Sequence, residues 1–185
     1  MKKIFTTTLI LLSGFILNAQ SVSHNFSFKL GSTGNETSNK IKYDAAGNIY
    51  VTGSFDDIVD FDPSATSSYT MQANGLNQDC FILKWDNNTN FIWAKSFGND
   101  NEEYAGGIVI NNSGNVYVSG NFDGTVDFDP EAGTFNLTSN FYDLFVSALD
   151  SSGQFLWAIH VGGSGIEEGN DIAIDTADNI YVVGD

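Results

Sequence analysis

The sequence is poor in cysteine and in basic residues. Its single cysteine, Cys80, has no partner for an internal disulfide, so an oxidising compartment is tolerated without being exploited. Only 7 lysine and arginine residues stand against 23 acidic residues, which gives a formal net charge of −16. Such a charge repels nucleic-acid phosphates and anionic membrane surfaces, so neither is an expected partner, whereas cations and neutral ligands remain compatible.

A helical pattern and proline are also scarce. After residue 19, no stretch keeps the apolar period of three to four residues that an amphipathic helix needs. Proline occurs twice in 185 residues, while glycine occurs 19 times and aromatic residues make up 14%. A disordered chain would lack the aromatic residues, and a helical chain would not contain so many turn formers. The composition therefore predicts an all-β protein.

The first residues have the pattern of a secretory signal peptide. Lys2 and Lys3 precede a mostly apolar run over residues 4–17, and the small residue Ala19 follows. A membrane-spanning helix would need about 20 predominantly apolar residues, and this run is shorter. We therefore expect residues 1–19 to be cleaved off after Ala19, with no membrane insertion afterwards, and the product to be secreted or held at the cell surface.

One short sequence occurs three times at intervals of about 65 residues. Gly-Asn-Ile-Tyr-Val-Thr-Gly at 47–53 returns as near-copies at 114–120 and 178–184. Self-similarity at so long a period indicates that each repeating unit is a small sheet and not a single strand.

Each complete unit contains four apolar segments separated by turn residues, as in successive β-hairpins. The predicted strands are 41–43, 49–52, 81–85 and 91–95 in the first unit, 108–110, 116–118, 143–149 and 155–159 in the second, and 172–174 and 180–183 in the third. These segments are nearly continuous apolar runs, which indicates that both faces of each sheet are covered.

A four-stranded sheet covered on both faces by copies of itself is a propeller blade. We therefore predict an all-β fold, a partial β-propeller of four-stranded antiparallel blades, with about two full blades and partial blades at both ends. The expected boundaries are 20–31 for the last strand of a preceding blade, 32–98 for the first repeat, 99–162 for the second, and 163–185 for half of a third. Closed propellers have at least about four blades, so either the chain is a fragment of a longer protein or several copies assemble. We expect a fragment whose partners include the remaining blades of a longer protein.

The segment 143–184 resembles the bacterial SBBP-type β-propeller repeat. It leads from an aspartate-initiated strand through Trp157-Ala158 and Gly-Gly-x-Gly-x-Glu-Glu to Ile-Ala-Ile-Asp and Asn-Ile-Tyr-Val. Looser copies cover 79–120 and 26–53. The resemblance implies a secreted or cell-surface protein of a Gram-negative bacterium, often long and usually without an assigned activity. The chain departs from the pattern at Thr89, which replaces a turn glycine, and in an added Asp-Phe-Asp-Pro segment.

That added segment occurs identically at 60–63 and 127–130. In an extended chain the phenylalanine points to one side as an anchor and the two aspartates point outward on the other. Clustered carboxylates favour calcium, so the candidate metal ligands are Asp60, Asp62, Asp127 and Asp129. The alternative is that these aspartates cap backbone amides in ordinary turns, and the spacing lacks the pattern of an EF-hand loop. No cofactor is required, and calcium is the one candidate.

Other acidic residues also repeat. Three glutamates share one position in the three units and two more stand beside them: Glu36, Glu103, Glu167, Glu102 and Glu168. Paired acids suit glycoside hydrolysis, but repetition in every unit argues against a single active site. We expect them to be solvated or turn-bonding side chains on one rim. The two histidines, His24 and His160, have neither zinc-like spacing nor a neighbouring serine nucleophile.

The sequence favours an exported, non-catalytic propeller segment that serves as a scaffold or as a binding surface for an extracellular protein or carbohydrate. The alternatives are part of a secreted propeller hydrolase acting on extracellular polysaccharide, and a calcium-dependent adhesion module. Catalysis predicts one loop that breaks the repeat with extra polar residues, whereas binding or scaffolding predicts equivalent loops. The repeated Asp-Phe-Asp-Pro segments favour equivalent loops.

Overall fold

The computed structural model describes residues 30–31, 34–62, 64 and 66–185, and every regular element in them is a β-strand. The predicted signal peptide, 1–19, lies outside the described residues, as does most of the strand predicted at 20–31. Within the described ranges, no helix has the length and apolar character needed to cross a membrane.

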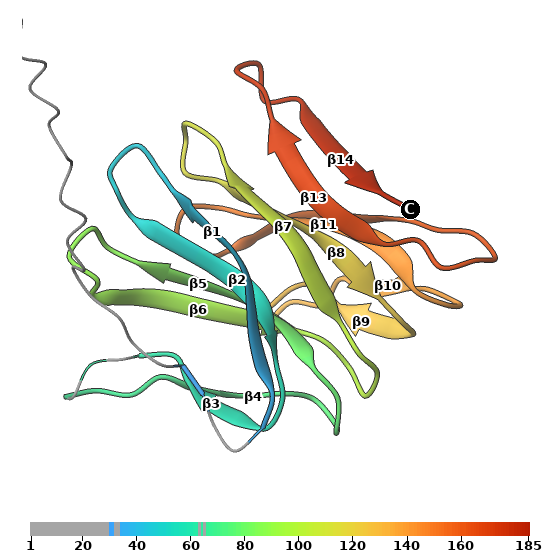
Figure 1. Cartoon of the computed structure of the whole chain (residues 1–185), viewed down its shortest axis with the longest axis horizontal. Coiled ribbons are helices and arrows are strands. Elements are labelled where there is room, and N and C mark those ends of the chain that lie inside the picture. Colours follow the sequence, from blue (N-terminus) through green and yellow to red (C-terminus); the bar gives the residue numbers. More distant parts are fainter. Residues whose placement is uncertain (1–29, 32–33, 63, 65) are drawn as a thin grey trace, which may run out of the picture.

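Three sheets follow one another along the chain (Figure 1). The first is formed by β1 (Glu36–Tyr43), β2 (Ile49–Phe55), β5 (Asp79–Trp85) and β6 (Phe91–Phe97). The second is formed by β7 (Tyr104–Ile110), β8 (Val116–Phe122), β11 (Asp143–Leu149) and β12 (Phe155–Val161). The third consists of β13 (Gly169–Ile174) and β14 (Ile180–Gly184). All neighbouring strands are antiparallel and in up-and-down order.

Two short hairpins are added to this framework. They pair β3 (Ile58–Asp60) with β4 (Thr70–Gln72), and β9 (Thr125–Asp127) with β10 (Asn136–Thr138). Every strand that the sequence predicts within the described residues lies inside one of the longer elements, and the four short strands were not predicted. The fold is a partial β-propeller with two complete blades and the first two strands of another, which confirms the predicted fold class.

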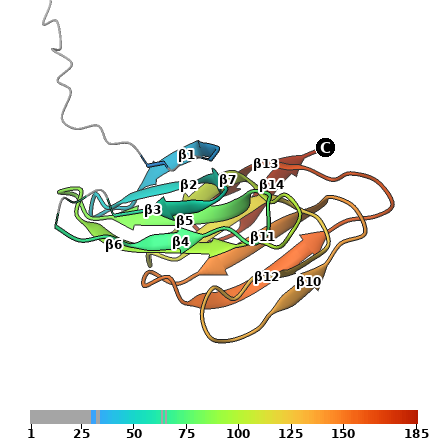
Figure 2. The same cartoon turned by 90° about the horizontal axis from the view of Figure 1, so that it is seen from below.

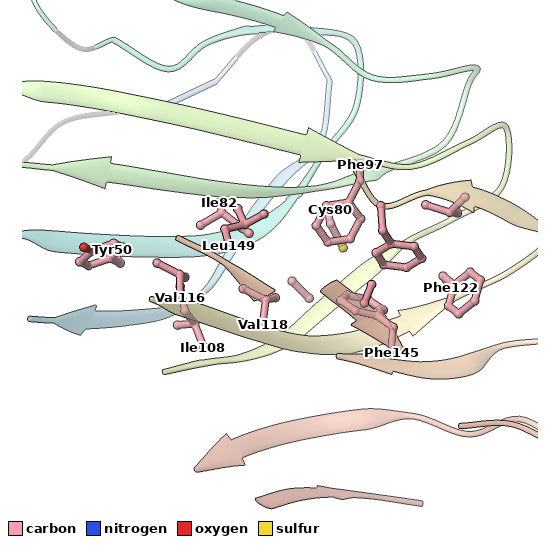
Figure 3. Close-up of a cluster of buried hydrophobic side chains, with 14 of the residues drawn as sticks. Tyr50, Cys80, Ile82, Phe97, Ile108, Val116, Val118, Phe122, Phe145 and Leu149 are labelled. Carbon is pink, nitrogen blue, oxygen red and sulfur yellow. The ribbon is translucent and has the colours of Figure 1, made fainter. Parts of the chain in front are cut away.

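The blades pack broadside on one another through apolar side chains (Figures 2 and 3). The largest cluster lies between the first and second blades, where Tyr50 and Ile82 from one sheet meet Ile108 and Val118 from the other. The opposite face of the second blade packs on the third blade through residues that include Val109 and Ile172. Adjacent residues of β7 thus point to opposite faces, and both faces are buried, as the continuous apolar strands predict.

Trp93 is an inter-blade packing residue. Its side chain is 7% exposed, and its indole N–H donates to the backbone carbonyl of Ser151 in the second blade at 3.3 Å. Lys84 donates to the same carbonyl at 2.7 Å. The first blade is therefore tied to a turn of the second by polar contacts as well as by apolar burial.

The innermost strands carry the same irregularity in each blade. A β-bulge interrupts the pairing of β1, β7 and β13 near their first residues. Opposite the bulge in the second blade, a Cβ on Gly120 would lie 1.9 Å from the carbonyl oxygen of Tyr104, so a side chain does not fit there. The matching glycines, Gly53 and Gly184, make the same close approach to Thr37 and Glu168. The glycine that ends each repeated peptide is thus required by backbone proximity.

Five hairpin turns share one hydrogen-bond pattern, at 44–48, 86–90, 111–115, 150–154 and 175–179. In the fourth, Oδ1 of Asp150 accepts hydrogen bonds from the backbone N–H groups of Ser152 at 2.8 Å and Gln154 at 3.0 Å. In the last, the side-chain hydrogen bond from Asn179, together with backbone donors, lowers the pKa of Asp175 to about 2. The first residue of each turn is Asp or Asn because only a short side-chain oxygen reaches these donors.

The strand register separates two ends of the sheets. The turn end carries the five shared turns, next to the row Tyr43, Ile49 and Trp85. The loop end carries the row Glu36, Phe55 and Asp79, together with the short hairpins and the connections between blades. Figure 1 shows the short hairpins at the opposite end of the sheets from the shared turns.

The fourth residue of each shared turn has positive φ, which favours glycine. The φ values are 84° at Gly47, 67° at Thr89, 83° at Gly114, 84° at Gly153 and 62° at Asp178. Because a β-branched residue is strained in this region, we expect Thr89→Gly to raise the free energy of unfolding by about 0.5–1 kcal/mol, measured by urea denaturation. Thr176→Gly, at a turn position without positive φ, is the control and should give no gain. An equal gain in both variants would contradict this account of the turn.

Candidate functional site

The loop end carries the two short hairpins, and each is anchored by the phenylalanine of its Asp-Phe-Asp-Pro segment. Phe61 and Phe128 are both fully buried. The Phe128 ring centroid lies 5.2 Å from that of Phe122, 5.1 Å from that of Phe145 and 4.9 Å from that of Phe97 in the first blade. Burying such a ring contributes about 1.5–3 kcal/mol, which is enough to hold a short hairpin against the blade.

The aspartates on either side of these rings accept hydrogen bonds from their own hairpins. Oδ1 of Asp60 accepts from the N–H groups of Asp62 and Tyr69, at 3.0 and 2.8 Å. Oδ1 of Asp127 accepts from Asp129 and Phe135, at 3.1 and 2.7 Å. The first aspartate of each pair therefore joins the two strands of its hairpin across the turn, which is the turn-capping alternative.

The second aspartates make shorter-range bonds. Asp62 accepts from the backbone N–H of Ser64 at 2.9 Å and from the hydroxyl of Ser67 at 2.5 Å, and these bonds lower the pKa of its carboxyl. Asp129 accepts from the N–H of Glu131 at 3.0 Å. Asp62 is only 8% exposed, so the expectation that both carboxylates of this segment face outward is wrong for Asp62. The hydrogen bonds from Ser64 and Ser67 hold the Asp62 carboxylate against its own loop.

The four candidate calcium ligands lie two to a hairpin, on separate blades. Among the described residues, no three or more side chains of His, Cys, Asp or Glu gather closely enough to hold a metal ion. Calcium at either pair would need further oxygen ligands, since this ion takes six to eight. A calcium site at these aspartates stays a prediction.

Two other acids are buried where the first blade meets the connection to the second. Asp79 and Glu103 are both fully buried. A Cβ on Gly98 would lie 2.3 Å from Oδ1 of Asp79 and 2.6 Å from Oε2 of Glu103, so both carboxyl groups crowd the same glycine. Asn74 donates to Asp79 from its backbone N–H at 3.1 Å and its side chain at 2.9 Å, and the Asn99 N–H donates to Glu103 at 2.9 Å.

Burial raises the pKa of both acids. Loss of hydration raises the pKa of Asp79 to about 6 and that of Glu103 to about 8, and at Glu103 the charge of Asp79 adds to the effect. Oδ1 of Asp79 and Oε1 of Glu103 are buried with no hydrogen-bond partner among the described residues. Glu103 is thus held protonated at neutral pH. The expectation of a solvated rim is wrong for Glu103, because the connection between blades folds it inward, whereas turn bonding is confirmed.

The corresponding place in the second blade has different chemistry. Asp143, which begins β11 as Asp79 begins β5, lies 2.7 Å from Nδ1 of His160. Glu167 is half-buried and accepts from the N–H of Gly163 at 3.1 Å, the counterpart of the bond between Asn99 and Glu103. His160 therefore serves as a partner for a buried aspartate, and the sequence reasoning that excluded metal and triad roles did not identify this contact.

Comparison with known proteins agrees with the fold. No profile of a known protein family matches the chain. The chain is similar to an uncharacterized WD repeat-containing protein of Acanthamoeba polyphaga mimivirus, with 28% identity over 153 residues. The similarity covers 78% of this chain and 11% of the relative. WD repeats fold as four-stranded propeller blades, which agrees with the four-stranded sheets of this chain. The finer assignment to SBBP-type repeats stays a prediction.

The buried acid pair predicts how stability depends on pH. The folded state holds protons on Asp79 and Glu103 up to pH values of about 6 and 8, whereas ordinary values are 3.8 and 4.5. Their contribution to stability is therefore fully present below about pH 4 and is lost as pH rises through 6 and 8. We expect Glu103→Gln to be more stable than the parent at pH 9, and similar to it at pH 5, in urea unfolding.

Glu167→Gln is the matched control, because Glu167 occupies the same repeat position but is only half-buried. This variant should keep the parent's dependence on pH between 5 and 9. If Glu103→Gln also kept the parent's dependence of stability on pH, the buried acid pair would not be the source of that dependence. The turn aspartates do not interfere in this range, because their pKa values are lowered and they titrate at more acidic pH.

Proposed function

We propose that this chain is an exported, non-catalytic stretch of a β-propeller that serves as a scaffold and binding surface outside the cell. The observation that carries the proposal is the repeated loop end, where both complete blades present the same phenylalanine-anchored hairpin. The signal-peptide pattern of residues 1–19 supports export. The similarity to a WD repeat-containing protein supports a scaffold or binding role.

Uncovered apolar surface on both outer blades supports further blades as partners. A groove of about 500 Å³ at the first blade is lined by Ile41, which is 51% exposed, and has the buried side chains of Val51 and Phe55 in its wall. On the opposite side, Val161 and Val183 are 59% and 62% exposed. Surfaces of this kind are covered by a neighbouring repeat in stacked proteins, so we propose that remaining blades of a longer chain occupy both sides.

The acids of the loop end support the hydrolase alternative less well than they support a scaffold. A glycosidase needs two carboxyl groups that both reach the glycosidic bond. Asp79 and Glu103 are fully buried, so neither touches a polymer in solution. Asp60 and Asp127 each hold two backbone amides of their own hairpins. These roles are structural, which favours scaffolding over catalysis.

The proposed function is tested with the product exported from a Gram-negative host. We expect mass spectrometry to find a secreted chain that begins at Gln20, and incubation with extracellular polysaccharides such as cellulose, xylan and alginate to release no reducing ends. A chain retained in the cytoplasm would overturn export. Release of reducing ends that is abolished by substituting loop-end acids to their amides would overturn the non-catalytic assignment in favour of a hydrolase.

The calcium-dependent adhesion alternative rests on the four aspartates of the repeated hairpins. If calcium binds there, it stabilises the folded state by mass action, so a chelator should lower the melting temperature. We expect Asp62→Asn and Asp129→Asn to abolish any such shift, with Asp100→Asn, an exposed aspartate outside the hairpins, as the control. A melting transition that does not respond to chelator or to added calcium would remove this alternative.

A further inference from the structure

A groove of about 460 Å³ lies at the loop end between the second and third blades. Its lining combines two tyrosines, two glutamates, two asparagines and one isoleucine: Glu102, Tyr104, Asn121, Tyr142, Ile166, Glu168 and Asn170. These residues come from the starts of β7 and β13, from β8, and from the loops that precede β7, β11 and β13. β13 packs beside both β7 and β8, as Figure 1 shows, so segments far apart in the sequence meet here.

The backbone around the groove is well fixed. Tyr104 pairs with Asn121 across the β7–β8 ladder. The carbonyl of Tyr142 accepts from the N–H of Glu167 at 2.7 Å, and the N–H of Glu168 donates to the carbonyl of Asp185 at 2.7 Å. The walls therefore belong to the sheets and to bonded connections, which is the kind of support that a preorganised binding site requires.

The tyrosines of the groove differ from the residues at the equivalent positions of the first blade. Residues that the fold needs return in successive blades, as Gly53, Gly120 and Gly184 do. By contrast, the first-blade counterparts of the groove tyrosines are not aromatic: Thr37 stands at the position of Tyr104, and Gln78 at that of Tyr142.

The counterpart positions at the first junction carry polar side chains that are buried or hydrogen-bonded within the first blade. Ser54, the counterpart of Asn121, is fully buried there. The side chain of Gln78 donates to the carbonyl of Asn35 at 2.9 Å. The fold therefore forms without the groove residues at the first junction, so their presence at the second is not explained by packing.

The charge of the groove favours a cation. The carboxylates of Glu102 and Glu168 are exposed, and neither belongs to the three ion pairs found among the described residues. Burial and the charge of Glu102 raise the pKa of the Tyr142 phenol, so this side chain is neutral at physiological pH. Two glutamates beside two tyrosine rings supply charge attraction and cation–π contact together.

We propose that this groove binds a basic side chain, a guanidinium or ammonium group presented by an extracellular polypeptide. Glu102 and Glu168 neutralise the charge, the rings of Tyr104 and Tyr142 contact the alkyl stem and the cation, and the side-chain oxygens of the asparagines accept remaining hydrogen bonds. The high negative charge of the whole chain assists encounter with such a partner. This inference deepens the proposed binding function and rests on it.

The test uses the full chain and two small probes. N-acetyl-arginine amide carries the guanidinium group, and N-acetyl-citrulline amide has the same length without the charge. In a titration followed by NMR, we expect saturable binding of the arginine probe, weakened at high salt, and at least about fivefold weaker binding of the citrulline probe.

Three variants locate the site. Glu102→Gln and Glu168→Gln should each weaken the arginine probe about two- to fivefold, because each removes one exposed charge partner. Glu131→Gln, which removes a glutamate remote from the groove, should leave binding unchanged. All three positions are exposed, and far-ultraviolet circular dichroism should confirm that the fold is retained.

The remaining outcomes contradict the inference. Equal binding of both probes, no saturable binding, or binding unaffected by the two groove substitutions would each overturn it. If a neutral sugar such as N-acetylglucosamine displaced the arginine probe, the ligand of the groove would be a carbohydrate and not a basic side chain. None of these results bears on export or on release of reducing ends, so failure of the ligand assignment is distinguishable from failure of the proposed function.

Discussion

Burial of both faces of the middle strands of the two complete blades is the constraint on which the rest of this structure depends. β2 and β5 are buried along their whole lengths, which a sheet with one solvated face cannot achieve. A single blade would leave the side chains of one face in water, and each Å² of apolar surface left exposed in this way forgoes about 25 cal/mol of stabilisation. Each blade is therefore stabilised by the neighbour that packs against it.

The same stacking determines the chemistry at the loop end. Where the connection from one blade crosses to the next, it covers groups that an isolated sheet would leave in water. Glu103 is carried into the interior in this way, next to Asp79, and within the described part of the chain neither acid forms an ion pair with a basic side chain. At the next junction a histidine occupies the neighbourhood of the equivalent aspartate. The same backbone arrangement thus holds a buried aspartate in two ways: beside a second buried acid at the first junction, and paired with a histidine at the second.

Much of the fold could be predicted from the sequence, because strand identity was marked by apolar runs and by turn residues repeated in register. The short strands β3, β4, β9 and β10 were not predicted, since three residues give too little pattern, although the buried anchors Phe61 and Phe128 were correctly interpreted. The burial of Glu103 could not be read from the sequence, because it depends on how a connection folds back over the blade.

The groove between the second and third blades was not predicted either, because its residues are distant in sequence, although Glu102 and Glu168 were noted as acids beside the repeated glutamate. A signal was nevertheless present. Tyr104 and Tyr142 are aromatic where their first-blade counterparts, Thr37 and Gln78, are polar. In a chain built of copies, positions that differ between copies are the ones to inspect for function, once the packing of the blades brings them together.

The contrast between the two ends of the sheets has a consequence for protein engineering. At the turn end, the five turns have identical length, and four of the five backbone amides in each donate to a side-chain or main-chain oxygen of the same turn. At the loop end, the segment between the second and third strands spans 56–78 in one blade and 123–142 in the other, so unequal lengths are accommodated above the same framework. Foreign peptides for display would therefore be tolerated between the strands of these short hairpins, with the buried ring retained as the fixed point of attachment.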